Sequence, residues 1–404
     1  MSEGVDDPKT FPAKVPYIGL ALSGGGSRAI AFHLGCLRAL HDRGVLQKVR
    51  VLSSVSGGSV IAAAYAYWPC SFSDFDQRIV DLLRRGFQRR IAWTALMSRE
   101  TPKILFTLIF SGGMTFVLSC VRWLVSFGRA LLGFPTTELE RWLIRVCENL
   151  PHPGNLSTAF EHVLARDLFG ATAVSEVRHA GLDVILNACD LRTGTAFRFG
   201  NRVSGGWRYG EISAGESVSV AKAVAASAAY PLLLPPLFER FTFVRKGQQR
   251  EETVVLTDGG VFDNLGVSVL EPGRSADISV HVSETTHLIC LNASAGQLDG
   301  LDKPMWWAGR VMRSFETVHR KAQDSAYGRL HRYLETGELS GFVMVYLGQD
   351  DARLPVKPHD LVPRDAVRNY PTDFAPMSSE NIALIAMRGE QLTHMLVDHY
   401  AADL

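Results

Sequence analysis

The sequence predicts an α/β protein with a mostly parallel central sheet and helices on both faces of that sheet. Short apolar runs suited to buried strands alternate along the chain with helical patterns, and strands are expected at residues 17–22, 49–52, 182–187 and 287–292. Short loops join these elements, which is typical of a sheet covered on both sides. In such sheets the functional groups belong at the carboxyl ends of the strands.

The composition of the 404-residue chain indicates an ordered globular protein, with 47% hydrophobic and 21% charged residues. A formal net charge of +1 argues against a protein that binds nucleic acid through bulk charge. The six cysteines form no C-x-x-C pair, so we expect reduced thiols without a metal site or a disulfide framework. Residues 1–14 have no apolar segment and predict a mobile tail rather than a secretory signal, which favours a cytoplasmic location.

The stretch around Ser56 predicts a nucleophile elbow. An apolar strand pattern at 49–52 leads into a Ser/Gly cluster, and an alanine-rich run at 61–67 is typical of a helix. A serine at a sharp turn between strand and helix has its hydroxyl exposed and its backbone strained. The usual pattern is G-x-S-x-G, and Ser54 stands in place of its first glycine. An ordinary Ser/Gly turn explains the same spacing equally well.

Three glycines, Gly24, Gly25 and Gly26, lie between the first strand and a helix expected at 29–41. Glycines in this place let backbone N–H groups converge on an anion, helped by the helix dipole. A dinucleotide site needs the spacing G-x-G-x-x-G, which is not met after Gly26. An oxyanion hole needs only donors near a nucleophile, and Ser56 follows one strand–helix unit later. A tight turn without a binding role is the third interpretation.

Asp258 is the candidate general base, because it comes directly after an apolar strand pattern at 253–256 and before Gly259 and Gly260. A solvated aspartate is a poor base for a serine hydroxyl, so this role requires burial or a hydrogen bond from the serine. Asp263 is an alternative base, although its position suggests a structural turn. His33, alone on a helix, is expected to be a packed residue.

An apolar insertion at about 85–150 contains the uncharged run 104–121 and continues with apolar residues to 134. A transmembrane helix is one interpretation, but a single span would separate Ser56 from Asp258 across the bilayer. A buried core segment is the second. The third, which we favour, is a monotopic apolar hairpin that enters one leaflet, where Arg89, Arg90, Arg122 and Arg129 meet anionic head groups.

Four motifs in one order resemble the patatin-like phospholipases over about residues 17–295. They are Gly24-Gly25-Gly26-Ser27-Arg28, Ser54-Val55-Ser56-Gly57-Gly58, Ala225-Ala226-Ser227-Ala228-Ala229-Tyr230-Pro231 and Asp258-Gly259-Gly260. The longer strings around the first and last motifs look like a bacterial branch of the family, whose chains continue into a C-terminal part like residues 300–404. Ser23 departs from the family pattern, in which an aspartate often precedes the glycines.

The resemblance implies one catalytic domain over 15–404 that carries the insertion and a C-terminal helical part. It implies a Ser56–Asp258 dyad and an oxyanion hole at Gly24, Gly25, Gly26 and Gly57. It also implies acyl-ester hydrolysis of membrane phospholipids or lysophospholipids, with no metal or other cofactor. Arg28 would orient the glycine loop or attract a phosphate head group. We therefore expect a cytoplasmic enzyme with peripheral or monotopic membrane association.

Two other functions fit parts of the sequence. One is a regulatory or binding protein on the same scaffold with little activity, against which the intact Ser56 and Asp258 argue. The other is a non-lipid esterase with a Ser-His-Asp triad, for which His281, His287 and His319 are the available histidines. None of these histidines follows a clear strand-end motif. The lipid head group, the acyl position and the oligomeric state are left open.

Overall fold

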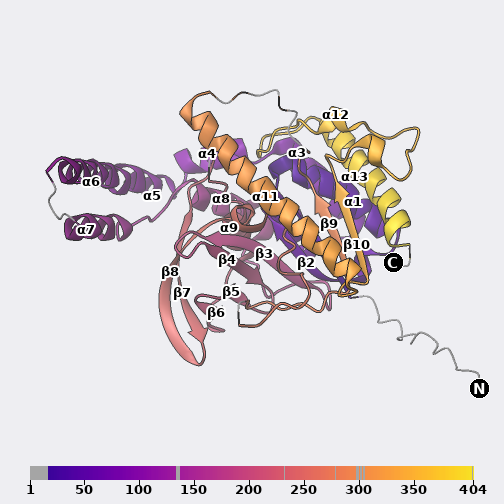
Figure 1. Cartoon of the computed structure of the whole chain (residues 1–404), viewed down its shortest axis with the longest axis horizontal. Coiled ribbons are helices and arrows are strands. Elements are labelled where there is room, and N and C mark those ends of the chain that lie inside the picture. The colour runs from indigo at the N-terminus through magenta and orange to yellow at the C-terminus, as the bar shows by residue number, and fades with distance from the viewer. Residues whose placement is uncertain are drawn as a thin grey trace, which may run out of the picture.

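The computed structural model describes residues 17–132, 137–231, 233–277, 279–296, 300, 303, 305–402 and 404, so the tail expected at 1–14 lies outside the described residues. Its centre is one ten-stranded sheet with the strand order β10-β9-β1-β2-β3-β4-β5-β6-β7-β8 (Figure 1). The strands are β1 (Ile18–Leu22), β2 (Val49–Val55), β3 (Asp183–Asp190), β4 (Thr195–Gly200), β5 (Ser204–Gly206), β6 (Gly210–Ile212), β7 (Leu237–Arg245), β8 (Gln248–Asp258), β9 (His287–Asn292) and β10 (Gly341–Tyr346).

The sheet has a parallel half and an antiparallel half that meet at β3. Strands β10, β9, β1, β2 and β3 are parallel neighbours, and every pairing from β3 through β8 is antiparallel. The antiparallel half curls back, because β8 also pairs with β3. This second pairing brings the end of β8 to the carboxyl edge of the parallel half.

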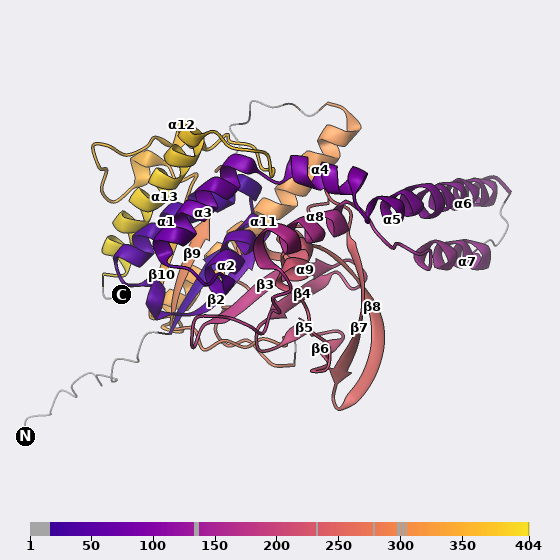
Figure 2. The ribbon, with the colours of Figure 1, turned by 180° about the vertical axis from the view of Figure 1, so that it is seen from behind.

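Helices cover both faces of the parallel half, which confirms the predicted fold class. Figure 1 shows α11 (Trp307–Glu335) crossing the near side, and Figure 2 shows the other side under several helices. The larger core lies on that other side. The helices that contribute to it include α1 (Gly26–Asp42), α2 (Gly57–Tyr67), α3 (Phe72–Arg85), α8 (Leu156–Leu164), α9 (Val220–Ser227) and α13 (Ser379–Tyr400). A smaller core packs Ala326 and Leu330 of α11 against β9 and β10.

The C-terminal part differs from the expectation of a purely helical segment. It contains α11, the short α12 (Arg364–Val367) and α13, but also β10, which is the outermost strand of the parallel half. Helices α13 and α1 pack along each other, where Gly35 faces the backbone of Ala386 so closely that a Cβ would collide with it. Residues after 340 therefore complete the sheet and its cover.

The apolar insertion forms an arm that projects from the body (Figures 1 and 2). After α4 (Gln88–Met97) the chain runs outward as one helix made of α5 (Thr101–Phe106), the wider π turn η2 (Thr107–Gly112) and α6 (Gly113–Leu132). It returns antiparallel as α7 (Thr137–Glu148), beside α6. We call residues 101–148 the arm.

The arm corrects two interpretations of the insertion. A buried core segment is wrong, because only 11% of the most apolar window of the helix at 101–131 is buried. That helix is long and apolar enough to cross a membrane, and it is the one such helix found among the described residues. The hairpin expected within 104–134 is instead formed by this long helix and α7, so the chain leaves and re-enters the body on one side. Residues 133 and 134 of the expected range lie outside the described residues.

Candidate active site

Ser56 occupies the turn between β2 and α2 in the geometry of a nucleophile elbow. Its backbone has φ 53° and ψ −123°, a conformation that non-glycine residues rarely adopt. Its carbonyl accepts hydrogen bonds from the N–H groups of Ser59 and Val60, which start α2. The turn directs the positive end of the α2 dipole toward the space beside Ser56.

A buried chain of hydroxyl groups supports this turn. The Ser56 N–H donates to Ser227 Oγ at 3.0 Å, and the Ser227 hydroxyl donates to the Asn187 carbonyl at 2.6 Å. Ser59 Oγ lies 2.8 Å from Ser227 Oγ and 3.1 Å from Ser54 Oγ. Ser54, which replaces the usual glycine, is thus part of the support. The block around Ser227 belongs to the family resemblance, but this role was not predicted, because nothing local in the sequence indicates a contact 171 residues away.

Sheet register places Asp258 opposite Ser56. Val55 is level with Asn187 in the parallel β2–β3 pair, and the next residue of β3, Ala188, is level with Asp258 in the antiparallel β3–β8 pair. Ser56 follows Val55, so both candidate groups stand at the carboxyl edge of the sheet with β3 between their strands. Gly259 packs against the Asn187 carbonyl, where a Cβ would collide.

Asp258 is buried and only partly satisfied. Its Oδ1 accepts a hydrogen bond of 2.7 Å from the Gly260 N–H, whereas Oδ2 has no partner of good geometry among the described residues. Burial raises the pKa of Asp258 to about 6, against the lowering effects of the Ser56 hydroxyl and the Gly260 N–H. A carboxylate with a free oxygen, facing a serine hydroxyl and with its pKa near neutral, is suited to accept a proton.

The glycine loop at the start of α1 lies directly against the elbow. A Cβ at Gly57 would collide with the Gly26 backbone, so only glycine permits this approach. Among the described residues, no acceptor pairs with the N–H groups of Gly25, Gly26 or Gly57, which leaves three donors beside Ser56. The expectation that Gly24 also contributes a donor to the oxyanion hole is wrong. Its N–H donates to the Asn264 carbonyl and is not available for an oxyanion.

Arg28 does not lie where a head group would meet it. Its side chain is buried in α1 and donates to the Tyr370 carbonyl at 2.9 Å. Burial lowers the pKa of Arg28 to about 10. The expected contact with a phosphate is therefore corrected to a structural tether between α1 and the C-terminal part.

The C-terminal part also holds the glycine loop, a contact that no sequence pattern predicted. The Asp373 carbonyl accepts a hydrogen bond from the Ser27 N–H at 2.6 Å and lies against Gly26. The next residue, Phe374, accepts from the Phe87 N–H at the start of α4 and packs on the rings of Phe87 and Phe160. One short segment thus touches both the candidate oxyanion loop and the base of the arm.

The histidines do not complete a triad among the described residues. His33 is a packed core residue that contacts the Leu291 carbonyl, and burial lowers its pKa to about 3. His281 contacts the Val203 carbonyl, with a pKa lowered by burial to about 3, and His287 is level with Ile18 at the opposite edge of the sheet. His319 on α11 reaches the Gly260 backbone, but no hydrogen bond joins it to Ser56 or Asp258.

Asp263 is a structural residue, as its position suggested. Its carboxylate accepts hydrogen bonds from the N–H groups of Leu265, Gly266 and Ser268 and so closes the turn after α10 (Gly260–Asp263). This role leaves Asp258 as the carboxylate that faces Ser56.

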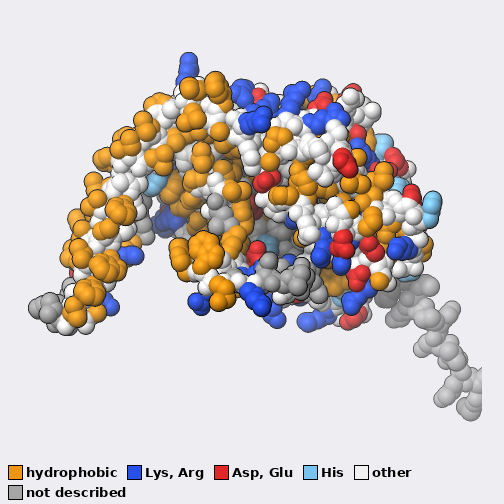
Figure 3. Space-filling model, turned by 90° about the horizontal axis from the view of Figure 1, so that it is seen from above, with side chains coloured by type: hydrophobic (Ala, Val, Ile, Leu, Met, Phe, Trp, Pro, Cys, Tyr) orange, Lys and Arg blue, Asp and Glu red, His pale blue; other side chains and the backbone are white. Residues whose placement is uncertain are grey.

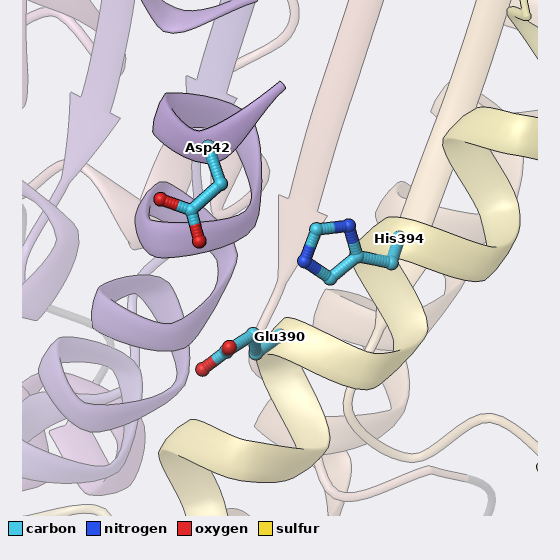
Figure 4. A group of neighbouring side chains, drawn as sticks. All are labelled: Asp42, Glu390 and His394. Atoms are coloured by element: carbon cyan, nitrogen blue, oxygen red, sulfur yellow. The ribbon is translucent and has the colours of Figure 1, made fainter. Parts of the chain in front are cut away.

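A group of potential metal ligands lies elsewhere, on the outer surfaces of α1 and α13. Asp42, Glu390 and His394 lie with ligand atoms within 4.8 Å of one another (Figure 4). Arg38 lies 4.0 Å from Glu390, and Arg43 lies 3.5 Å from His394. The adjacent arginines account for this cluster as part of a surface ion-pair network.

The strand–turn–helix serine, the facing carboxylate and the adjacent glycine loop thus lie together at the carboxyl edge of the sheet. A patatin-like phospholipase family profile matches residues 20–270, well over half of the chain, and the protein belongs to this family of lipid acyl hydrolases. No curated protein matches the chain at a significant level.

Solved structures with a similar arrangement include VipD from Legionella pneumophila and human GIVD cytosolic phospholipase A2. VipD is 14% identical over 95% of this chain and 67% of its own, with a TM-score of 0.38. The human enzyme is 15% identical over 95% of this chain and 58% of its own, with a TM-score of 0.48. The chain thus spans about three fifths to two thirds of their lengths, and family membership rests on the profile match.

Proposed function

We propose that the protein hydrolyses acyl esters of membrane glycerolipids, phospholipids or lysophospholipids, with Ser56 as nucleophile and Asp258 as the general base. The observation that carries this proposal is the strained Ser56 backbone opposite a buried Asp258 with one unsatisfied oxygen. Family membership supports the lipid substrate. The dyad itself is inferred from the geometry.

In the first step, Asp258 accepts the Ser56 proton while Ser56 Oγ bonds to the ester carbonyl carbon. The carbonyl oxygen becomes an oxyanion, which the N–H groups of Gly25, Gly26 and Gly57 are placed to bind. Asp258 then gives its proton to the departing alcohol as the carbon–oxygen bond breaks. The result is an acyl-Ser56 ester and a lyso product or glycerol derivative.

Water completes the cycle by the reverse proton path. Asp258 takes a proton from a water molecule, whose oxygen attacks the acyl carbon within the same group of donors. The bond to Ser56 Oγ breaks, and the serine recovers the proton as the fatty acid leaves. One carboxylate with a pKa near 6 suits both roles, because it is mostly ionised at neutral pH yet binds a proton more readily than a solvated aspartate.

The arm is proposed to bring this edge of the sheet to a lipid surface. On α6 the polar side faces α7, where Glu140 accepts from Ser126 at 2.9 Å and from Arg129 at 3.3 Å. The other half of the helix is apolar and open to solvent: Met114, Phe116, Val117, Val121, Trp123, Leu124, Phe127 and Leu131. Burying such a surface in a bilayer would be favourable by a free energy on the order of 10 kcal/mol, which is not gained while the surface stays in water.

Charge and length favour insertion into one leaflet over a full crossing. Residues 84–134 contain eight arginines and lysines and a single acidic residue, against a net charge of +1 for the whole chain. Each cation near an anionic membrane contributes on the order of 1 kcal/mol. Helix α7 has 12 residues and would span only about 18 Å, while the hydrocarbon core measures about 30 Å. A monotopic arm keeps Ser56 and Asp258 on one side.

The function is tested by incubating the pure protein with vesicles of phosphatidylcholine and phosphatidylglycerol and identifying the products by mass spectrometry. Asp258→Asn serves as the matched inactive protein. We expect free fatty acid and lysophospholipid from the wild type and neither from the variant. Release of the products by both proteins, or by neither while a short soluble ester is cleaved by the wild type, would contradict the lipid hydrolase proposal.

A further inference from the structure

A second exposed apolar cluster lies at the beginning of α11, outside the family match and outside the arm. Met305, Trp306, Trp307 and Val311 are 83%, 66%, 74% and 61% exposed. Large apolar side chains at this exposure are common singly on protein surfaces, but four within seven residues form a patch. We call these four residues the α11 cluster.

The topology puts the α11 cluster at the catalytic edge of the sheet. Helix α11 leads into β10, which runs parallel to β9 and β1, so α11 begins at the edge where these strands end. His319, partway along α11, is level with Gly260 beside Asp258. Trp307 precedes His319 by twelve positions and therefore stands about 18 Å farther out along the helix.

The α11 cluster and the arm lie on the same face of the molecule. Figure 3 shows apolar side chains along the arm and a second apolar group across a hollow from it. Five of the seven tryptophans, Trp93, Trp123, Trp142, Trp306 and Trp307, lie on the arm, on α4 at its base or in the α11 cluster, each more than half exposed. Tryptophan prefers the boundary between membrane and water, where its ring is buried and its N–H stays hydrated.

The charge around the α11 cluster indicates what kind of surface binds there. Residues 303–321 contain Lys303, Arg310, Arg313, Arg320 and Lys321 and one acidic residue, Glu316. A second copy of the chain would set this positive patch against itself, which is unfavourable. An anionic bilayer surface offers both the opposite charge and a place for the indole rings.

From this we infer that the α11 cluster is a second membrane-docking site, specific for anionic phospholipid bilayers, which together with the arm seats the catalytic edge on the membrane. The inference deepens the proposed function, since it names the surface from which that site takes its substrate. Docking at two separated points also fixes the orientation of the protein, which an arm alone does not. A lipid leaving the bilayer between the two contacts would enter the hollow that they flank.

The test measures vesicle binding by the full chain in a Ser56→Ala background, so that no lipid is consumed and the result does not depend on hydrolysis. Trp306→Ser with Trp307→Ser is compared with Tyr400→Ser, an aromatic residue 58% exposed at the far end of α13. Vesicles contain phosphatidylcholine alone or with phosphatidylglycerol, and binding is measured by flotation. We expect the tryptophan pair to weaken binding to the mixed vesicles about tenfold, while Tyr400→Ser binds like the parent protein.

A second variant separates charge from burial. Arg310→Glu should weaken binding to the mixed vesicles and leave binding to phosphatidylcholine unchanged. Parent-like binding by the tryptophan variant would overturn the inference, as would a parent protein that sediments as a dimer and becomes a monomer only in that variant. Circular dichroism and hydrolysis of a short soluble ester, in the same substitutions made with Ser56 present, check that fold and site are intact.

Discussion

At the catalytic edge, polar groups are buried and almost all paired, whereas on the arm apolar groups are exposed and unpaired. Ser54, Ser59, Ser227 and Asn187 share hydrogen bonds inside the protein, while Asp258 Oδ2 has no hydrogen-bond partner among the described residues. The arm has the reverse pattern, with its polar contacts between α6 and α7 and its apolar side outward. Each region violates the usual rule for a protein in water at the place where its function is proposed.

The difference separates two tasks that one enzyme must perform. The catalytic edge needs fixed donors and a desolvated base, so it is built from short contacts between strands and helices distant in sequence. The arm needs to move its apolar side chains from water into lipid. Part of the free energy that stabilises it therefore comes only from contact with a membrane. Variants should therefore divide into those that stop chemistry on every ester and those that stop only turnover at a bilayer.

The largest effect is expected for Ser56→Ala. Loss of the nucleophile should lower turnover of both a soluble ester and vesicle lipid by a factor of about a thousand or more, with the fold retained. Initial rates on both substrates and a thermal melt measure this. If turnover persists, the nucleophile lies elsewhere, and Ser59 is the next residue to replace.

Asp258→Asn should remove activity to a similar extent and also reveal the cost of the buried charge. The pKa of about 6 in the folded protein lies above the ordinary value of 3.8. Well below pH 3.8 the carboxyl is protonated whether the chain is folded or not, and no difference arises. As the pH rises from 3.8 to about 6, the buried charge costs the folded state an increasing amount, which levels above pH 6 at roughly 3 kcal/mol and which the variant avoids.

The matching measurement is the free energy of unfolding at about pH 3 and pH 8. We expect the variant to be more stable than the wild type at pH 8 and nearly equal to it at about pH 3. A variant that is less stable at pH 8 would mean that the carboxylate is satisfied in the folded protein. If His319→Ala lost as much hydrolytic activity as Asp258→Asn, with its fold intact, this would argue for a catalytic triad.

Gly25→Ala should lower kcat by roughly a hundredfold and change KM little, because the disturbed donors act mainly in the transition state. Gly25 is the mildest choice in this loop, since a Cβ would contact Ala29 at 3.2 Å, whereas at Gly26 it would strike the backbone of Asp373. Gly44→Ala is the control, with a φ of 67° but open space around it. If both variants lost equal activity, the loss in Gly25→Ala would be due to backbone strain and not to disturbed oxyanion donors.

The smallest effect on chemistry is expected from Leu108→Asp with Phe116→Asp on the arm. Both side chains are about 70% exposed, so hydrolysis of a soluble ester should change less than twofold. Vesicle binding and vesicle turnover should fall about tenfold or more. Val356→Asp, at an apolar residue 61% exposed elsewhere, is the control. Collapse of soluble-ester activity together with vesicle binding would show that the arm is structural.

Local patterns predicted four of the five parallel strands, the turn at Ser56 and the position of Asp258 at the end of a strand, because a short stretch of sequence marks each of them. The strand β7 was missed although Leu237, Phe241 and Phe243 carry an alternating pattern. β10 was missed because a six-residue apolar run is not distinctive. The support from Ser227 and the contact of Asp373 with the glycine loop depend on residues at least 171 positions apart, which no local pattern encodes.

The insertion was harder to predict for a different reason. Gly112 and Gly113 lie in the middle of the apolar run, yet the helix continues through them, with Gly112 ending a π turn and Gly113 beginning α6. Its apolar composition fits a core, a span or a lipid-facing surface equally well. The exposed apolar side of α6 rules out a core, and the proposal of a lipid-facing surface rests on the arrangement of α6 beside α7 with polar sides together.

The central claim, that Ser56 is activated by Asp258, is tested most directly by the rate of covalent labelling with an alkyl fluorophosphonate. The rate is measured from pH 4 to pH 9, and the modified residue is located by peptide mass spectrometry. We predict a label on Ser56 whose rate rises through about pH 6 and then levels, with no such rise in Asp258→Asn. A label on another serine, or the same pH profile in Asp258→Asn, would contradict the account.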